Sequence, residues 1–261
     1  MTELESFFSE KGLLSKVIQG YLPRQSQFEM ADAIANAIEV KKNLIAEAGT
    51  GTGKTFAYLA PAIFSNKKVI ISTGTKNLQD QLFNKDLPLM RKAIKVSFKS
   101  ALLKGRANYL CTYRLENALN TSFGFSKQDA VALAHIKAWS KRTNMGDISE
   151  ISDVQENDPI WSQATSNVDN CLGQECADYA DCFLVKARKR AQEADIIVVN
   201  HHLLCADWSL RKTGFGELLP NAEVVIIDEA HQLSEIASNF LGMSLSARQL
   251  NEVAADTLIE Y

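Results

Sequence analysis

The sequence has no long hydrophobic run. Its longest apolar stretch, residues 57–64, contains Pro61, whereas a membrane-spanning helix needs about 20 apolar residues. The N-terminus, Met1 to Glu5, is acidic where a secretory leader would be basic and then apolar. Only 13 of the 261 residues are glycine and 5 are proline, while 46% are hydrophobic, so collagen, a coiled coil and general disorder are excluded. We therefore expect a cytoplasmic globular protein with no membrane part.

Charge is distributed unevenly along the chain, although the formal net charge is only −3. Between Lys85 and Arg114 there are eight basic residues and one acidic residue, Asp86. From Asp147 to Asp181 there are nine acidic residues and no basic one. The basic stretch could hold a phosphate backbone, or it could be an ordinary solvated helix surface, and the charges alone leave both readings open.

Short apolar runs rich in β-branched residues predict four strands, at residues 44–46, 69–71, 196–199 and 224–227. They lack polar alternation, which is typical of strands covered on both faces. Helix-like stretches at 54–65, 77–83 and 186–193 separate them, so the pattern indicates an α/β fold with a parallel sheet. The region 105–190 breaks this rhythm, and we interpret it as an inserted subdomain.

A glycine-rich segment follows the first predicted strand and leads into a helix. It resembles the Walker A pattern, with alanine at the first position where the stricter pattern has glycine. Its glycines let successive backbone amides turn inward toward anionic oxygens at a helix N-terminus. The lysine can reach the β- and γ-phosphates of a nucleotide, and the following threonine can ligate Mg²⁺. The predicted nucleotide-binding residues are Ala48, Gly49, Thr50, Gly51, Thr52, Gly53, Lys54 and Thr55.

An acidic pair, Asp228 and Glu229, follows the last predicted strand. In a P-loop sheet an acidic residue at the C-terminal edge of a strand holds Mg²⁺, and we assign this role to Asp228. Glu229 could then orient and deprotonate the attacking water. The alternative is that the pair only caps the helix that follows. Together with the phosphate loop, the pattern predicts a catalytic set of Lys54, Asp228 and Glu229.

Four cysteines lie in or near the polar middle segment. Cys171, Cys176 and Cys182 are closely spaced, and Cys111 lies upstream. Four thiolates can hold either structural zinc or an iron-sulfur cluster, and the spacing does not choose between them. Cys205 follows an apolar pair and is assigned to the core, and His201 and His202 are assigned structural roles.

These motifs carry a family resemblance. The Asp-Glu-Ala-His run at 228–231, together with the phosphate loop, resembles superfamily 2 helicases, whose first RecA-like lobe binds ATP. Arg24 and Gln27 resemble the adenine-reading Q motif of that superfamily, with Gln27 as the reader. Residues 72–75, with Thr73 and Thr75, resemble its motif that contacts the DNA backbone. Arg106 and Tyr109 are further candidates for DNA contact, although core packing is the alternative for the tyrosine ring.

The segments 105–111, 170–173 and 199–204 resemble the iron-sulfur helicases of the XPD/DinG group, most closely the bacterial YoaA branch. The resemblance implies a 4Fe-4S cluster on Cys111, Cys171, Cys176 and Cys182. It further implies an ATP- and Mg²⁺-dependent 5′-to-3′ DNA helicase that acts on single-stranded or forked DNA near the nucleoid, with replication or repair proteins as possible partners. The fold it implies is a RecA-like P-loop parallel sheet with helices on both faces, interrupted by a mostly helical cluster insertion.

The resemblance also divides the chain. It implies a first part of the RecA-like lobe at 1–104, the cluster domain at 105–190, the second part of the lobe at 191–240 and the start of the family's arch insertion at 241–261. No motif of a second helicase lobe follows, so we expect the N-terminal part of a longer enzyme, with weak ATP binding and slow hydrolysis by itself.

Two other classes fit the bare motifs. One is a nucleic-acid-binding module with zinc in the four-cysteine site and a vestigial ATP site. The other is a P-loop ATPase unrelated to DNA, for which the basic stretch would be a coincidence.

Overall fold

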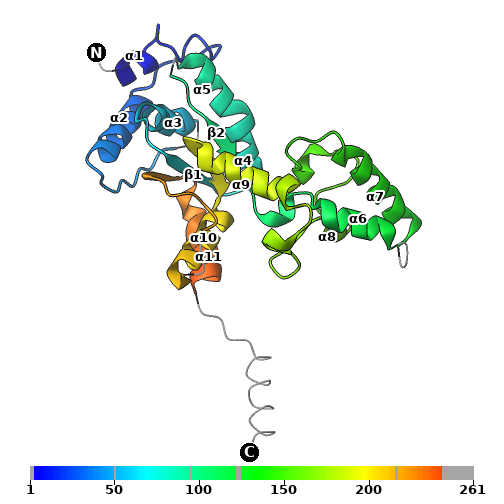
Figure 1. The fold of residues 1–261 in the computed structure, drawn as a ribbon. Coiled ribbons are helices and arrows are strands. Elements are labelled where there is room, and N and C mark those ends of the chain that lie inside the picture. Colours follow the sequence, from blue (N-terminus) through cyan, green and yellow to red (C-terminus); the bar gives the residue numbers. More distant parts are fainter. Residues whose placement is uncertain (1–2, 50, 95, 122–124, 215–216, 243–261) are drawn as a thin grey trace, which may run out of the picture.

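A four-stranded parallel sheet is built from segments that lie far apart in the sequence (Figure 1). The computed structural model describes residues 3–49, 51–94, 96–121, 125–214 and 217–242. The spatial order of the strands is β2-β3-β1-β4. In the register, Ile70 of β1 lies opposite Ile197 of β3 and Val225 of β4. The strands are β1 (Val69–Thr73), β2 (Ser100–Leu102), β3 (Ile196–Asn200) and β4 (Val224–Ile227).

Helices account for most of the remaining regular structure. The α-helices are α1 (Glu3–Phe8), α2 (Gln25–Glu39), α3 (Lys54–Phe64), α4 (Lys76–Gln81), α5 (Leu87–Ala93), α6 (Thr112–Asn120), α7 (Lys127–Ser140), α8 (Trp161–Ala164), α9 (Phe183–Glu193), α10 (His201–Thr213) and α11 (Leu233–Leu241). A π-helical turn, Leu82–Asp86, joins α4 to α5, and short 3₁₀ turns lie at Arg106–Asn108, Ile148–Glu150, Gly173–Glu175, Tyr179–Asp181 and Ala230–Gln232. Within the described part of the chain, no helix combines the length and apolar character needed to cross a membrane.

The sheet is covered on both faces, as its uninterrupted apolar strands predict. Alternate residues of β1, such as Val69 and Ile71, pack with α1, α2, α3 and α5 into one core. Ile70 points to the opposite face and packs with α9 and α10 into a second core. Because successive strand residues alternate between the faces, two helical layers enclose β1 and β3, whose apolar residues are almost fully buried.

The strand predicted at 44–46 is wrong, because this segment has no regular structure. A strand requires a hydrogen-bonded neighbour, but a cavity of about 990 Å³ lies between this segment and β4. Ile45 is consequently 99% exposed, and Val225 in the middle of β4 is 44% exposed. The other three predicted strands are confirmed as β1, β3 and β4, and the sequence did not predict the three-residue edge strand β2.

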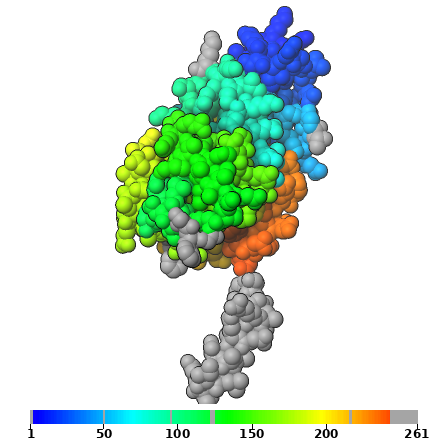
Figure 2. Space-filling model, turned by 90° about the vertical axis from the view of Figure 1, so that its right-hand side faces the viewer, coloured from blue at the N-terminus to red at the C-terminus, as the bar shows by residue number. Residues whose placement is uncertain are grey.

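The middle of the chain has its own hydrophobic core. Helices α6, α7 and α8 bury Leu115, Ile136 and Trp161 together, and Trp139 packs edge-to-face on Trp161 at 6.2 Å. In Figure 1 this insert stands to one side of the sheet, and Figure 2 shows it from its outer side. Phe183, at the start of α9, packs against both the insert core and the sheet core. The insert therefore joins the sheet through α9, which itself covers the sheet.

Candidate nucleotide-binding and cysteine sites

The glycine-rich loop ends at the first residue of α3. Gly51 and Gly53 have φ of 77° and 83°, a left-handed conformation that glycine adopts without steric penalty. Gly53 occupies the N-cap of α3 and has no side chain to accept hydrogen bonds from the first amides of the helix. These amides are therefore available to an anion, as at other helix N-termini. Thr50 lies outside the described residues.

Two side chains that precede the loop in the sequence donate hydrogen bonds to its backbone carbonyls. The guanidinium group of Arg24 donates to the carbonyl of Gly51. The buried Gln27 amide donates to the carbonyl of Gly53 at 2.9 Å and accepts from the Tyr21 hydroxyl at 3.0 Å. A Cβ at position 53 would lie 2.1 Å from the Gln27 nitrogen, so this close approach requires glycine. Gln27 thus supports the loop in this structure, and its reading of adenine stays a prediction.

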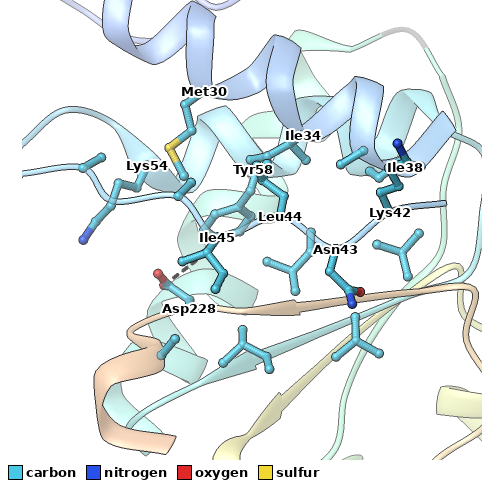
Figure 3. Close-up of a pocket in the computed structure, with 18 of the residues that line it drawn as sticks. Met30, Ile34, Ile38, Lys42, Asn43, Leu44, Ile45, Lys54, Tyr58 and Asp228 are labelled. Carbon is cyan, nitrogen blue, oxygen red and sulfur yellow. Dashed lines mark hydrogen bonds between the residues drawn. The ribbon is translucent and has the colours of Figure 1, made fainter. Parts of the chain in front are cut away.

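The structure brings the phosphate loop and the acidic pair together. Lys54 Nζ lies 3.4 Å from Glu229 Oε1, although 175 positions separate the two residues in the sequence. The Tyr58 hydroxyl donates to Asp228 Oδ2 at 3.3 Å (Figure 3). Lys54, Asp228 and Glu229, the predicted catalytic set, therefore meet at one end of the sheet. A lysine facing a carboxylate here can exchange that partner for a phosphate.

Asp228 lies in an environment that disfavours its charge. Burial raises the pKa of its carboxyl group above the ordinary value, and the neighbouring charge of Glu229 raises it further. Tyr58 and Lys54 act in the opposite direction on this pKa. A divalent cation would relieve the same repulsion between two adjacent carboxylates, so the electrostatics fit a Mg²⁺ ligand.

Tyr58 is a site residue that the sequence did not reveal. Burial and the Asp228 carboxylate raise its pKa well above the ordinary value, so the hydroxyl stays a donor. Thr55 also acts on this pKa through a side-chain hydrogen bond, which places the two predicted Mg²⁺ ligands beside the same hydroxyl. Tyr58 lies four positions after Lys54, on the same side of α3, and this spacing is the signal that could have found it.

The cavity beside this site is lined largely by apolar side chains. Met30, Ile34 and Ile38 of α2 face it from one side, and Leu44 and Ile45 border it near β4 (Figure 3). Lys54, Tyr58 and Asp228 lie at one end of the cavity, and Lys42 and Asn43 lie at the other (Figure 3). The nucleotide loop and the open edge of β4 thus border one continuous space.

The four predicted cluster ligands are all free and partly buried. Burial raises the pKa of the Cys111 thiol, and negative charge on Cys182, Cys176 and Cys171 raises it further. Burial and the nearby Arg106 lower the pKa of the Arg188 guanidinium group, and negative charge on Cys171 and Cys182 acts in the opposite direction. Among the described residues, however, no three His, Cys, Asp or Glu side chains form a group that could hold a metal ion. Cys205 is fully buried, which confirms its assignment to the core.

The predicted DNA-binding residues differ in accessibility. Thr75 is exposed and caps α4 by accepting from the Leu78 amide at 3.2 Å, and Arg106 is half-buried. Thr73 is buried at the end of β1, 1% exposed. Tyr109 is 4% exposed, and its hydroxyl accepts from the Lys104 amide at 3.0 Å. The prediction that Tyr109 stacks on a base does not fit this burial, whereas the alternative of core packing does.

A glycine-rich loop that opens a helix, together with a lysine facing an acidic pair at the end of a parallel strand, defines a P-loop nucleotide-binding domain. Comparison with known proteins places this domain among the helicases. The DEAD/DEAH box helicase family matches residues 28–121, and the DEAD_2 family matches residues 75–250. The chain belongs to the DEAD_2 family.

Individual relatives agree with this assignment. The chain is 51% identical to the ATP-dependent DNA helicase YoaA of Haemophilus influenzae, over 99% of this chain and 40% of the relative. It is 52% identical to YoaA of Escherichia coli, over 97% of this chain and 40% of the relative. It is 34% identical to the ATP-dependent helicase DinG of Mycobacterium tuberculosis, over 88% of this chain and 37% of the relative. The resemblance to the DinG group is confirmed, and the chain spans about 40% of the length of the YoaA relatives.

Proposed function

We propose that the chain is the ATP-binding portion of a DNA helicase that translocates 5′ to 3′ along single-stranded DNA. The observation that carries this proposal is the meeting of Lys54 with Glu229 and of Tyr58 with Asp228 at the end of the sheet. Membership of the DEAD_2 family supports it, and so do the relatives named as ATP-dependent DNA helicases.

The roles of the residues follow from their positions. The amides at the start of α3 and the Lys54 ammonium group bind the nucleotide phosphates. Thr55 and Asp228 would hold Mg²⁺, which would neutralise charge on the nucleotide phosphates. Glu229 accepts the proton of the attacking water. In this proposal the Lys54 ammonium group exchanges the Glu229 carboxylate for the phosphates when nucleotide binds, and the carboxylate then becomes available as a base.

We also propose that Cys111, Cys171, Cys176 and Cys182 hold a 4Fe-4S cluster. When bound, such a cluster supplies a cross-link that ties the insert loops together. Two observations support this proposal: Cys171, Cys176 and Cys182 lie close enough to Cys111 to raise its pKa, and the Arg188 guanidinium group lies near Cys171 and Cys182. The exposed Thr75 and the half-buried Arg106, with the accessible basic residues of the stretch 85–114, would contact the DNA backbone.

Nucleotide binding is tested with a fluorescent ATP analogue and Mg²⁺. Lys54→Ala should abolish binding, because the phosphates lose their only mobile cation in the loop, while the melting temperature stays unchanged since Lys54 is partly exposed. Lys141→Ala, which removes an exposed lysine at the end of α7, is the matched control. Undiminished binding by Lys54→Ala would refute the assignment of the site.

The cluster is tested by iron and sulfide content after anaerobic purification. Cys171→Ser should lose both elements and the brown colour, whereas Cys205→Ala, which alters a buried core cysteine, should keep them. A colourless wild-type protein that contains zinc would support the zinc-binding alternative instead.

A further inference from the structure

A buried histidine contacts the segment 72–75, which comprises the last two residues of β1 and the two residues that follow and is called the loop 72–75 below. His201, the first residue of α10, is 0% exposed, and its Nδ1 lies 2.7 Å from the Ser72 Oγ. The Ser72 hydroxyl is equally shielded from water, and buried polar groups are favourable only while they are paired. This hydrogen bond therefore fixes the imidazole ring against the end of β1.

The same ring also faces the acidic turn. Burial lowers the pKa of the imidazole. The backbone groups of Glu229 and Asp228 are close enough to act on this pKa in the opposite direction. Its Nε2 is buried, and no described residue forms a hydrogen bond with it. The Asp228 amide meanwhile donates to the Ser72 carbonyl at 2.8 Å. Ser72 thus links the buried His201 ring to the partly buried Asp228 through two hydrogen bonds.

The acidic turn depends on support from its surroundings. Glu229 has φ of 55° and ψ of 44°, a left-handed conformation that is uncommon for a residue other than glycine. Such a conformation persists only where neighbouring groups hold it. The buried His201 ring is one of the groups placed to do so.

A second contact joins the same two segments. The Gln232 side chain lies over Gly74, where a Cβ would stand 2.2 Å from the Gln232 Oε1. Gly74 lies in the loop 72–75, and Gln232 lies three positions after Glu229. The loop and the acidic turn are therefore in contact at two places, one at the Ser72–Asp228 backbone hydrogen bond, beside the His201 ring, and one through Gln232.

We propose that His201 is a positioning residue that couples the loop 72–75 to the Asp228–Glu229 turn, so that nucleic acid at the loop and nucleotide at the turn strengthen each other's binding. This inference rests on the proposed function, which places DNA at the loop and nucleotide at the turn. A coupling of this kind is reciprocal and typically changes affinity about 5- to 150-fold.

The test measures the affinity of the chain for a single-stranded oligonucleotide with and without a saturating non-hydrolysable ATP analogue and Mg²⁺. In the wild type the analogue should tighten oligonucleotide binding at least about 5-fold. His201→Leu keeps an apolar group of similar size in the core and removes the hydrogen bond, so each ligand should still bind but the ratio should fall to about 1. His201→Asn, whose amide can still pair with Ser72, should restore part of the ratio.

His202→Asn is the matched control, because His202 is the exposed neighbour of His201. It should leave the ratio at the wild-type value. If His201→Leu does not fold, Ser72→Ala removes the same hydrogen bond with a smaller change and should also lower the ratio.

The outcomes separate this inference from the proposed function. A wild-type ratio in a folded His201→Leu or Ser72→Ala protein overturns the inference, even if the melting temperature has fallen, because His201 would then be structural only. A wild-type protein that binds both ligands without coupling overturns it as well. A wild-type protein that binds neither ligand refutes the proposed function, and the inference falls with it.

Discussion

Tyr109 is a buried residue whose ionisation links stability to pH. Burial raises the pKa of its phenol to about 12, above the ordinary value of 10.0. The hydrogen bond that the phenol oxygen accepts from the Lys104 amide acts in the opposite direction on this pKa, but burial has the larger effect. Folding therefore favours the neutral form, and the stability that this residue contributes is fully present below pH 10.

We expect the wild-type protein to lose about 2 to 3 kcal/mol of unfolding free energy through Tyr109 between pH 10 and pH 12, at about 1.4 kcal/mol per pKa unit. The reason is that the unfolded phenol ionises near its ordinary pKa, while the folded one ionises only near 12. Tyr109→Phe should show a flatter alkaline profile in urea unfolding, although it is less stable at neutral pH by about 1 kcal/mol because the Lys104 amide loses its acceptor. Parallel alkaline profiles for the two proteins would contradict this assignment.

The charged residues of the nucleotide site could be predicted from the sequence, because a lysine or a carboxylate has few other uses at such a position. Lys54, Asp228 and Glu229 were expected together because each follows a predicted strand or turn at the same edge of a parallel sheet. The pairing of Tyr58 with Asp228 was not predictable, because tyrosine serves as a core residue far more often than as a carboxylate partner. The burial of Tyr109 was likewise decided by packing between distant segments.

At the scale of elements, a buried lysine joins the insert to the sheet. Lys104 follows β2 and is 2% exposed. Its Nζ lies 2.9 Å from Asp80 of α4 and 2.8 Å from Asp147 of the insert. Burial alone would lower the lysine pKa, but the hydrogen bonds that the ammonium group donates to these carboxylates raise it. Three elements therefore depend on a single ammonium group.

Lys104→Met should lower the unfolding free energy by about 3 kcal/mol, because it leaves two carboxylates partly buried without their cation. Lys186→Met is the matched control, since Lys186 pairs with the exposed Asp181 and such pairs contribute about 0 to 1 kcal/mol. Equal effects of the two substitutions in urea unfolding would show that the Lys104 cluster does not hold these elements together.

Gly146 of the insert lies close against the Phe183 ring at the start of α9. It has φ of 66°, and a Cβ there would lie 2.2 Å from the Phe183 ring. Phe183 in turn packs against both the insert core and the sheet core. The contact between the two parts of the molecule thus depends on the absence of a side chain.

Gly146→Ala should destabilise the protein by about 2 to 4 kcal/mol, through backbone strain of about 1 kcal/mol plus overpacking against Phe183. Gly173→Ala isolates the first contribution, because Gly173 has φ of 58° with nothing within 4 Å of its Cβ position. The difference between the two variants in thermal or urea unfolding measures the overpacking. No difference would mean that Phe183 moves away at no cost.

At the scale of the whole molecule, the α/β class and the position of the insert were predictable, and the complete sheet was not. Runs of β-branched residues predicted β1 and β3 because helices cover these strands on both faces, and they also predicted β4, although Val225 in its middle is exposed. Strand β2 has only three residues, Ser100–Leu102, too few for a periodic pattern to stand out. The run at 44–46 has the composition of a strand, but strand formation depends on a paired neighbour, which composition does not reveal.

The space between residues 44–46 and β4 leaves one edge of the sheet without a partner strand. An unpaired edge with exposed apolar side chains is a template for association between chains. We therefore expect concentration-dependent self-association in sedimentation or light-scattering measurements. Val225→Lys places a charge on the exposed middle of β4 and should reduce it, whereas Val131→Lys, on exposed α7 of the insert, should not. If Val225→Lys leaves self-association unchanged, the interface between chains does not include the β4 edge. The cavity beside the phosphate loop would thus border the nucleotide site and also limit the concentration at which the protein stays monomeric.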